Sequence, residues 1–243
     1  GKLAGMPCYE LWGGKSRSAV PVYVHADGRD YEEVAESVGR FMEKGFRYVR
    51  CQLGMYRGVS GEKAGRPVDT APGQLFDPRE KLRLVPKLFD HLRNKLGEEV
   101  ELIYDVHERM APIDSVRLAK ALEEYNLFFL EDIFAPEDIE WFRHVRGQCA
   151  TPLAMGELFA NQAELLPLVS NRLIDFIRMH VSDFGGITPC LKAAHLCEFY
   201  GIRTAWHGPN DITPIGMAVN VHLDMVLNNF GIQEWWLRSA LEK

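Results

Sequence analysis

The sequence has no cysteine pair at the spacing that metal or redox sites use. Its five cysteines are scattered over 243 residues and form no C-x-x-C motif, which argues against a zinc ribbon and a thioredoxin-type centre. An odd number of dispersed cysteines is typical of reduced thiols in the cytosol. We therefore expect a cytoplasmic protein without a disulfide framework.

Long apolar runs and clusters of basic residues are missing too. No stretch reaches the roughly 20 apolar residues that a membrane-spanning helix needs, and the first residues lack the apolar core of a secretory signal. The formal net charge is −6, and the lysines and arginines form no patch with interleaved aromatic residues. We therefore expect neither a membrane nor a nucleic acid as a partner.

Three apolar segments each end in a carboxylate, and the spacing between these acids is regular. The acids stand at positions 105, 131 and 157, so each follows the previous one by 26 residues. A strand, a helix and two loops fill about that length, and parallel neighbouring strands bring their carboxyl ends to one rim. Asp105, Glu131 and Glu157 would repel one another unless a cation lay between them. Oxygen ligands favour Mg²⁺, Mn²⁺ or Ca²⁺.

Strands and helices alternate along the whole chain. The apolar patterns predict strands at 20–26, 48–53, 100–106, 128–131, 152–157, 175–179, 203–206 and 231–235, with helices at 30–44, 79–96, 136–146, 161–169, 187–199 and 214–227. A further helix should start after Pro112, with Asp114 as its cap. Such alternation is typical of an α/β protein, and eight strands predict a (β/α)₈ barrel. A doubly wound open sheet is the alternative, but no Gly-rich phosphate fingerprint follows the first strand.

The ends of the chain and one long loop depart from this regular pattern. Residues 1–19, broken by Gly and Pro, read as a connector, and residues 20–243 as the barrel. An eighth helix is missing, or is only the short tail Leu237–Lys243. The loop at 54–78 is unusually long for a compact domain, and loops of that length are often functional.

Barrel active sites lie at the carboxyl ends of the strands. The groups expected there are His25, Arg50, Asp105, His107, Glu131, Glu157, Arg178, His180, His207 and Glu234. Asp105 and His107 are two residues apart, so on a strand they would share one face. Asp132 should then point away from Glu131 and be structural. Arg50 and Arg178 follow apolar segments, where each needs an anion, either a substrate or the neighbouring acids. His25 and His180 could equally be core histidines.

These motifs together resemble the enolase superfamily, and specifically its mannonate dehydratase branch, which includes proteins labelled starvation-sensing. The matching segments are Asp105-Val-His107, Leu130-Glu131-Asp132, Gly156-Glu157, Ile177-Arg178, Gly185-Gly186-Ile-Thr, His207-Gly-Pro-Asn-Asp211 and Gly231-Ile-Gln-Glu234-Trp. The resemblance implies the barrel portion of such an enzyme, without the N-terminal capping domain that closes the site in that superfamily.

The resemblance also implies an activity, a lyase that dehydrates a mannonate- or gluconate-like acid to a 2-keto-3-deoxy acid. Mg²⁺ would be held by Asp105, Glu131 and Glu157. A base would remove the proton α to the substrate carboxylate, and an acid would protonate the departing 3-hydroxyl. The implied roles are catalytic for Arg50, Tyr56, His107 and His207, and substrate-binding for Arg178, Asp211, Glu234 and Trp235.

Three features set this sequence apart within the superfamily. Arg50-Cys-Gln52 stands where many members carry Lys-x-Lys, so a lysine base is not expected. His180 occupies the place of the Asp that racemases pair with a histidine, which makes His207 less suited to be the main base. Tyr56, the candidate base, follows Arg50 by only six residues. Without the cap, apolar surface would be left over, so we expect a homo-oligomer.

Other functions fit the sequence less closely. A non-catalytic relative that binds acid sugars in a sensing role would keep the metal ligands. A barrel glycosidase needs two carboxylates flanking one bond, yet His207 stands where a second glutamate is expected. A zinc hydrolase would need an early His-x-His pair, which the sequence lacks.

Overall fold

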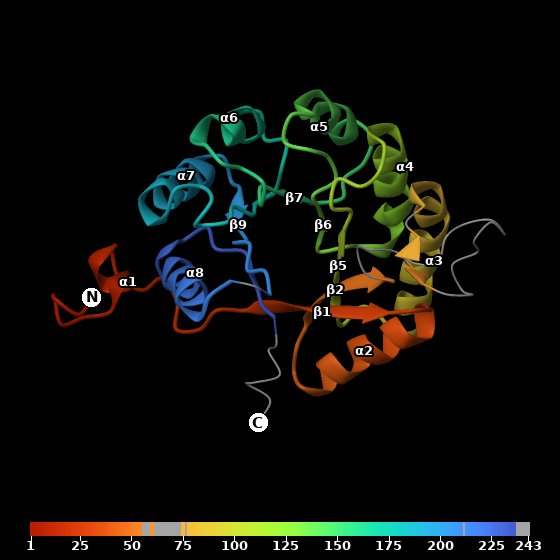
Figure 1. Cartoon of the computed structure of the whole chain (residues 1–243), viewed down its shortest axis with the longest axis horizontal. Coiled ribbons are helices and arrows are strands. Elements are labelled where there is room, and N and C mark those ends of the chain that lie inside the picture. Colours follow the sequence, from red (N-terminus) through yellow and green to blue (C-terminus); the bar gives the residue numbers. More distant parts are fainter. Residues whose placement is uncertain (55–58, 61–73, 76, 211, 237–243) are drawn as a thin grey trace. The chain divides into compact units, whose positions relative to one another are not determined.

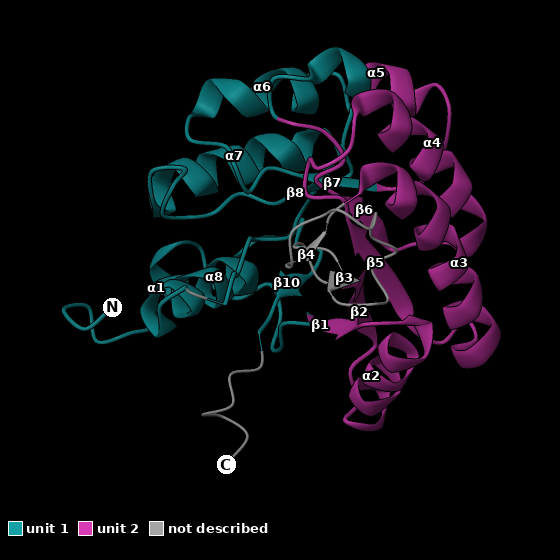
Figure 2. Ribbon diagram, turned by 45° about the vertical axis from the view of Figure 1, so that its right-hand side comes forward, with its two compact units in different colours: residues 1–23, 136–142, 153–243 teal, residues 24–135, 143–152 magenta. Residues whose placement is uncertain are grey.

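The protein was analysed as a computed structural model that describes residues 1–54, 59–60, 74–75, 77–210 and 212–236. The chain divides into two compact units. Unit 1 comprises residues 1–23, 136–142 and 153–243, and unit 2 comprises residues 24–135 and 143–152. Figure 2 shows the two units in separate colours, and each is described by itself.

Unit 2 contains four parallel strands and the helices that follow them. The strands are β1 (Val22–Gly28), whose first two residues belong to unit 1, β2 (Tyr48–Leu53), β5 (Glu101–Asp105) and β6 (Phe129–Glu131), and the helices are α2 (Tyr31–Glu43), α3 (Pro78–Leu96) and α4 (Pro112–Leu122). A short antiparallel pair, β3 (Val59–Ser60) and β4 (Gln74–Leu75), lies between β2 and α3 in the chain. Figure 1 shows the alternation of strands and helices along the colour gradient.

Parallel pairing in unit 2 brings acidic residues of different strands side by side. In the register of β5 and β6, Asp105 lies opposite Glu131. Helices α2 and α3 bury apolar side chains such as Val38 and Phe89. Helix α2 begins at Asp30, whose side chain accepts a hydrogen bond from the N–H of Glu33, so the first turn is capped and the strand-to-helix turn is well defined.

Unit 1 repeats the same alternation. Its strands are β7 (Leu153–Met155), β8 (Phe176–Ile177), β9 (Arg203–Thr204) and β10 (Gln233–Glu234), and its helices are α1 (Cys8–Leu11), α6 (Gln162–Ser170), α7 (Ile187–Phe199) and α8 (Pro214–Val226), while α5 (Ile139–Arg146) is divided between the units. Strands β7, β8 and β9 pair in parallel. Strand β10 pairs with the start of β1, so that Tyr23 lies opposite Glu234.

The predicted elements occur in the predicted order, but most strands are shorter than expected. The prediction of a strand at 175–179 corresponds to β8, which covers only Phe176–Ile177. The prediction that Asp114 caps α4 is wrong, because Ala111 is the N-cap and Asp114 instead pairs with Arg117 at 3.0 Å.

Parts of the prediction lie outside the described residues. These are Tyr56, Asp211 and the tail 237–243. The division into a connector at 1–19 and a barrel from 20 onwards stays a prediction. All five cysteines have free thiols. Among the described residues, no helix combines the length and the apolar character that crossing a membrane requires.

Candidate functional site

Two buried polar clusters lie at the carboxyl ends of strands, one in each unit. In unit 2, the carboxylate cluster consists of Arg50, Asp105, Glu131 and Asp132. In unit 1, the arginine–histidine cluster consists of Glu157, Arg178, His207 and Glu234. Nine of the eleven predicted site residues can be placed, seven of them in these two clusters and two, His107 and Trp235, beside them.

In the carboxylate cluster one guanidinium group joins two acids. Arg50 Nη1 lies 3.0 Å from Asp105 Oδ2 and 2.7 Å from Glu131 Oε1. The side chains of both acids are fully buried and that of Arg50 is almost so. An unpaired charge at such a depth would be strongly destabilising, so the guanidinium compensates both carboxylates. The expectation that Arg50 needs anions is met by the neighbouring acids.

Asp132 also belongs to this cluster, which strand alternation does not predict. One carboxylate oxygen each of Asp105, Glu131 and Asp132 lie within 4.8 Å of one another. Strand β6 ends at Glu131 and Asp132 has a φ of 41°, in the left-handed region. The expectation that Asp132 points away is therefore wrong, because alternation holds only within a strand. Three buried carboxylate oxygens at this separation are a donor set that fits a hard divalent cation such as Mg²⁺.

The backbone around Asp105 is held in place by two further hydrogen bonds. Gln52 Nε2 on β2 donates to the Asp105 carbonyl at 2.8 Å, and the N–H of His107 donates to Asp105 Oδ1 at 2.8 Å. His107 and Glu108 have φ values of 53° and 49°, so the chain leaves strand geometry immediately after β5. His107 thus lies next to Asp105, as predicted, but by a turn and not by sharing a strand face.

His107 is more accessible than the acids beside it. Its side chain is 31% exposed, and its Nδ1 lies 3.8 Å from Glu108 Oε2. A group that exchanges a proton with a bound molecule must be reachable from the rim, whereas a metal ligand can be deeply buried. The exposure of His107 is consistent with the first of these roles.

A buried lysine supports the end of β2 behind the cluster. Lys81 on α3 donates a hydrogen bond from Nζ to the carbonyl of Leu53. Burial lowers the pKa of Lys81 to about 8, although the charges of Glu80 and Asp27 oppose the shift. Burial raises the pKa of Asp27, and the charges of Arg50 and Lys81 oppose that shift. Asp27 and Lys81 carried no motif and were missed by sequence reasoning.

In the arginine–histidine cluster the guanidinium of Arg178 is fully buried and has three oxygen partners. Arg178 Nη1 donates to Glu157 Oε2 at 3.1 Å. Arg178 Nη2 donates to Glu234 Oε2 at 2.7 Å and to the Tyr23 hydroxyl at 2.8 Å. This cluster therefore has an orderly network of charge-assisted hydrogen bonds, which fixes the direction of each side chain.

The ring of His207 is tethered to the same acids. His207 Nδ1 lies 2.9 Å from Glu234 Oε2 and 3.2 Å from Glu157 Oε2. These two nearest partners are acceptors, whereas the donor Arg178 Nη2 lies farther away at 3.4 Å, so the network places the proton on Nδ1. In the neutral ring Nε2 then carries the lone pair and can accept a proton or a hydrogen bond.

Gly208 and His180 surround His207. The N–H of Gly208 donates to Glu234 Oε2 at 2.8 Å, and a Cβ atom at position 208 would lie 2.7 Å from the Glu234 carbonyl oxygen. Only glycine allows this close approach. His180 Nδ1 lies 3.2 Å from Asp183 Oδ1, and the rings of His180 and His207 meet edge to face with centroids 5.4 Å apart.

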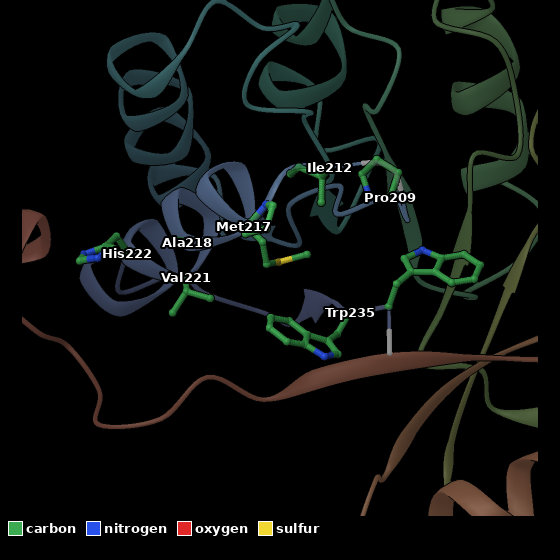
Figure 3. A pocket seen from close by; sticks show the side chains of 9 residues that line it. Pro209, Ile212, Met217, Ala218, Val221, His222 and Trp235 are labelled. Carbon is green, nitrogen blue, oxygen red and sulfur yellow. The ribbon is translucent and has the colours of Figure 1, made fainter. Parts of the chain in front are cut away.

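A largely apolar pocket of about 380 Å³ lies next to this cluster in unit 1. It is lined by Pro209, Ile212, Pro214, Met217, Ala218, Val221, His222, Trp235 and Trp236. Figure 3 shows Ile212, Met217 and Trp235 around this space. The predicted substrate contact Trp235 lines this pocket and directly follows Glu234 of the polar cluster in the chain.

Comparisons with known proteins show the family to which the chain belongs. A family model described as enolase C-terminal domain-like matches residues 33–242. A D-galactonate dehydratase family member from Musicola paradisiaca is 51% identical over 97% of this chain and 60% of its own length. A D-mannonate dehydratase from Rhizorhabdus wittichii is 42% identical over 96% of this chain and 60% of its own length. The chain therefore spans about 60% of the length of these curated relatives.

Solved structures give the same result for the fold. An enolase from Pantoea ananatis with bound D-gluconate and Mg has a TM-score of 0.92 and 51% identity, over 100% of this chain and 62% of that one. A putative dehydratase from Zymomonas mobilis has a TM-score of 0.83 and 25% identity, over 97% of this chain and 60% of that one. These matches confirm the predicted (β/α)₈ fold class.

Proposed function

Because the chain belongs to the enolase C-terminal domain-like family, as the resemblance of its motifs indicates, we propose that it is the catalytic portion of a Mg²⁺-dependent acid-sugar dehydratase. The carrying observation is the carboxylate cluster, in which carboxylate oxygens of three buried acids lie within 4.8 Å of one another and two of these acids bond to Arg50. The gluconate and Mg bound by the Pantoea ananatis enolase support this choice of ligands.

The proposed Mg²⁺ ligands are Asp105, Glu131 and Glu157. The first two meet the requirement for buried oxygen donors in close proximity. Asp132 is an alternative third ligand, because its carboxylate oxygen lies within 4.8 Å of theirs. Bound Mg²⁺ would supply Lewis-acid stabilisation of negative charge on the substrate carboxylate.

Different side chains would then act as the base and as the acid of the reaction. A base takes the proton α to the carboxylate, and Tyr56, paired with Arg50, stays the prediction for it. His107 donates a proton to the departing 3-hydroxyl, which leaves as water, so that no net proton is consumed. The product is a 2-keto-3-deoxy acid.

The second cluster would bind the rest of the substrate. Glu157 and Glu234 hold His207 in a fixed direction, and Nε2 of its neutral ring would accept a hydrogen bond from a substrate hydroxyl. Asp211 and Trp235 stay predictions for further substrate contacts. A cytoplasmic homo-oligomer likewise stays an expectation from the sequence.

The test is formation of 2-keto-3-deoxy acids from a panel of hexonates and pentonates, with Mg²⁺ and with EDTA. The variants Glu157→Gln and Asp132→Asn form a matched pair, because each removes one charge and little volume. We expect Mg²⁺-dependent product from the parent, a loss of about a thousandfold or more in Glu157→Gln and a smaller loss in Asp132→Asn. The reverse order would identify Asp132 as the third ligand.

Negative results would distinguish a binding protein from a failure of the whole proposal. A parent that forms no product, yet melts at a higher temperature with Mg²⁺, would be a binding protein for acid sugars and not a dehydratase. A parent with neither product nor a response to Mg²⁺ would overturn the proposal.

A further inference from the structure

Two buried amide side chains donate hydrogen bonds to backbone carbonyls of the segment that carries His207. Asn220 Nδ2 on α8 donates to the carbonyl of His207 at 3.0 Å. Gln233 Nε2 on β10 donates to the carbonyl of Trp206 at 3.2 Å and to that of Glu234 at 2.8 Å. Both side chains are completely buried. The segment that carries His207 is therefore held by side chains of two other elements.

Asn220 stands at a place where an apolar residue would be the ordinary choice. It lies inside α8 on the face that also buries Leu223 and the carboxyl group of Asp224. Its Oδ1 atom is buried and has no hydrogen-bond partner among the described residues. A buried acceptor without a partner costs roughly 1–3 kcal/mol. A leucine of similar volume would avoid that cost, so the contact with His207 has a value beyond simple packing.

The geometry explains what this contact does. The N–H of His207 donates to the carbonyl of Met179 at 3.2 Å, and the ring Nδ1 lies between the carboxylates of Glu157 and Glu234. The carbonyl is the remaining backbone group, and Asn220 holds it. With both backbone groups and one ring nitrogen tethered, the direction of the Nε2 lone pair is determined.

We propose that Asn220 is a positioning residue for His207, acting through the His207 carbonyl to aim Nε2 at the bound acid sugar. The catalytic consequence rests on the proposed function, but the orientation of the ring does not. A misplacement of about 1 Å in a catalytic group can reduce the rate about a hundredfold. Loss of Asn220 should therefore reduce activity more than its loss of stability explains.

The chain offers a matched control in Asn229, also in unit 1. Asn229 Nδ2 donates to the carbonyls of Ala194 at 3.0 Å and Ile202 at 2.9 Å. It makes the same kind of contact as Asn220, but to α7 and to the residue before β9, and not to the rim segment after that strand. The variants Asn220→Leu and Asn229→Leu remove the donor and keep a similar volume.

The experiment combines melting temperature, steady-state kinetics and the imidazole signals of histidines labelled with ¹³C, recorded at one pH. His207→Gln identifies the His207 signal by its disappearance. We expect both leucine variants to melt at lower temperature. Only Asn220→Leu should shift or broaden the His207 signal, and its kcat should fall by ~10–100-fold, with KM changed less.

An unchanged His207 signal in Asn220→Leu would overturn the proposal, as would an equal shift in Asn229→Leu. If Asn220→Leu does not fold, Asn220→Ser replaces it, since its shorter side chain cannot reach the same carbonyl, and an unchanged signal has the same meaning. A parent that turns over no acid sugar would count against the proposed function only, because the ring signal still decides the role of Asn220.

Discussion

The carboxylate cluster of unit 2 and the arginine–histidine cluster of unit 1 are built in the same way but differ in the charge of one member. In each, one buried arginine at a strand end bonds to two carboxylates, Arg50 to Asp105 and Glu131 and Arg178 to Glu157 and Glu234. The carboxylate cluster adds a third acid, Asp132, whereas the other adds the imidazole of His207.

This difference indicates different ligands. The carboxylate cluster brings three carboxylate oxygens close together, and such oxygens are the donors that a hard divalent cation prefers. The arginine–histidine cluster offers hydrogen-bond donors as well as acceptors, which suits the hydroxyls of a sugar acid. The comparison therefore predicts that the carboxylate cluster supplies most of the cation ligands, with Glu157 as the proposed third ligand, and that the arginine–histidine cluster supplies most of the contacts to hydroxyl groups.

Replacing the two arginines tests this difference between the clusters, and it should have the largest effect on the free energy of unfolding. Arg50→Met and Arg178→Met each leave two buried carboxylates without their guanidinium, so we expect each to lose roughly 3–5 kcal/mol of unfolding free energy in the presence of a chelator. Excess Mg²⁺ should restore more stability to Arg50→Met, because the three acids of its cluster lie close enough together to share one cation. Denaturant melts with and without Mg²⁺ measure both. Equal restoration in the two variants would contradict the comparison.

The buried lysine behind the carboxylate cluster predicts a pH effect. Lys81 has a pKa of about 8 in the folded protein and an ordinary value of 10.5. Between these values the unfolded chain binds more protons than the folded one, so stability relative to Lys81→Met should rise with pH, by roughly 3 kcal/mol at most. Below pH 8 the difference in unfolding free energy between the parent and Lys81→Met should not change with pH.

Urea melts from pH 7 to 10.5 measure this difference. Lys81→Arg is the control, because its charge persists throughout the range and it should lack the rise just as the methionine variant does. A parent that shows the same pH profile as both variants would exclude a depressed lysine pKa.

Substitution of two glutamines tests the comparison further, with a smaller expected effect, on ligand binding. Gln52 supports the Asp105 carbonyl in unit 2, and Gln233 supports the carbonyls of Trp206 and Glu234 in unit 1. We expect Gln52→Leu to weaken Mg²⁺ binding by ~10-fold or more, since groups behind a metal ligand orient it. Gln233→Leu should leave Mg²⁺ binding unchanged and weaken acid-sugar binding. Calorimetric titration of both ligands into both variants distinguishes them, and a crossed result would refute the assignment.

The sequence predicts the order of elements well because periodicity is a local property. The patterns locate β2 and α7 to the residue, since both are bounded by clear polar or glycine signals. The strand at 175–179 is overestimated, because the apolar run continues past Ile177 into rim residues that no longer pair. The cap of α4 is misplaced, because an acid in the first turn can pair with a side chain ahead of it.

The acidic residues of the site were equally accessible to sequence reasoning, whereas their supports were not. Asp105 and Glu131 could be found because each ends an apolar run. Gln52 and Asn220 leave no such signal, since their partners are backbone carbonyls that only the fold brings near. Asp132 was misjudged because the left-handed turn after β6 is invisible in the alternation of side chains.

The close contact at Gly208 determines how this molecule could change its substrate. No side chain fits at position 208, where Glu234 holds the backbone. Pro209, Ile212 and Trp235 line an open pocket next to it. Mutational libraries for a new acid sugar should therefore keep glycine at position 208 and vary those three residues. The positions that can be changed start at Pro209, directly after the glycine that cannot.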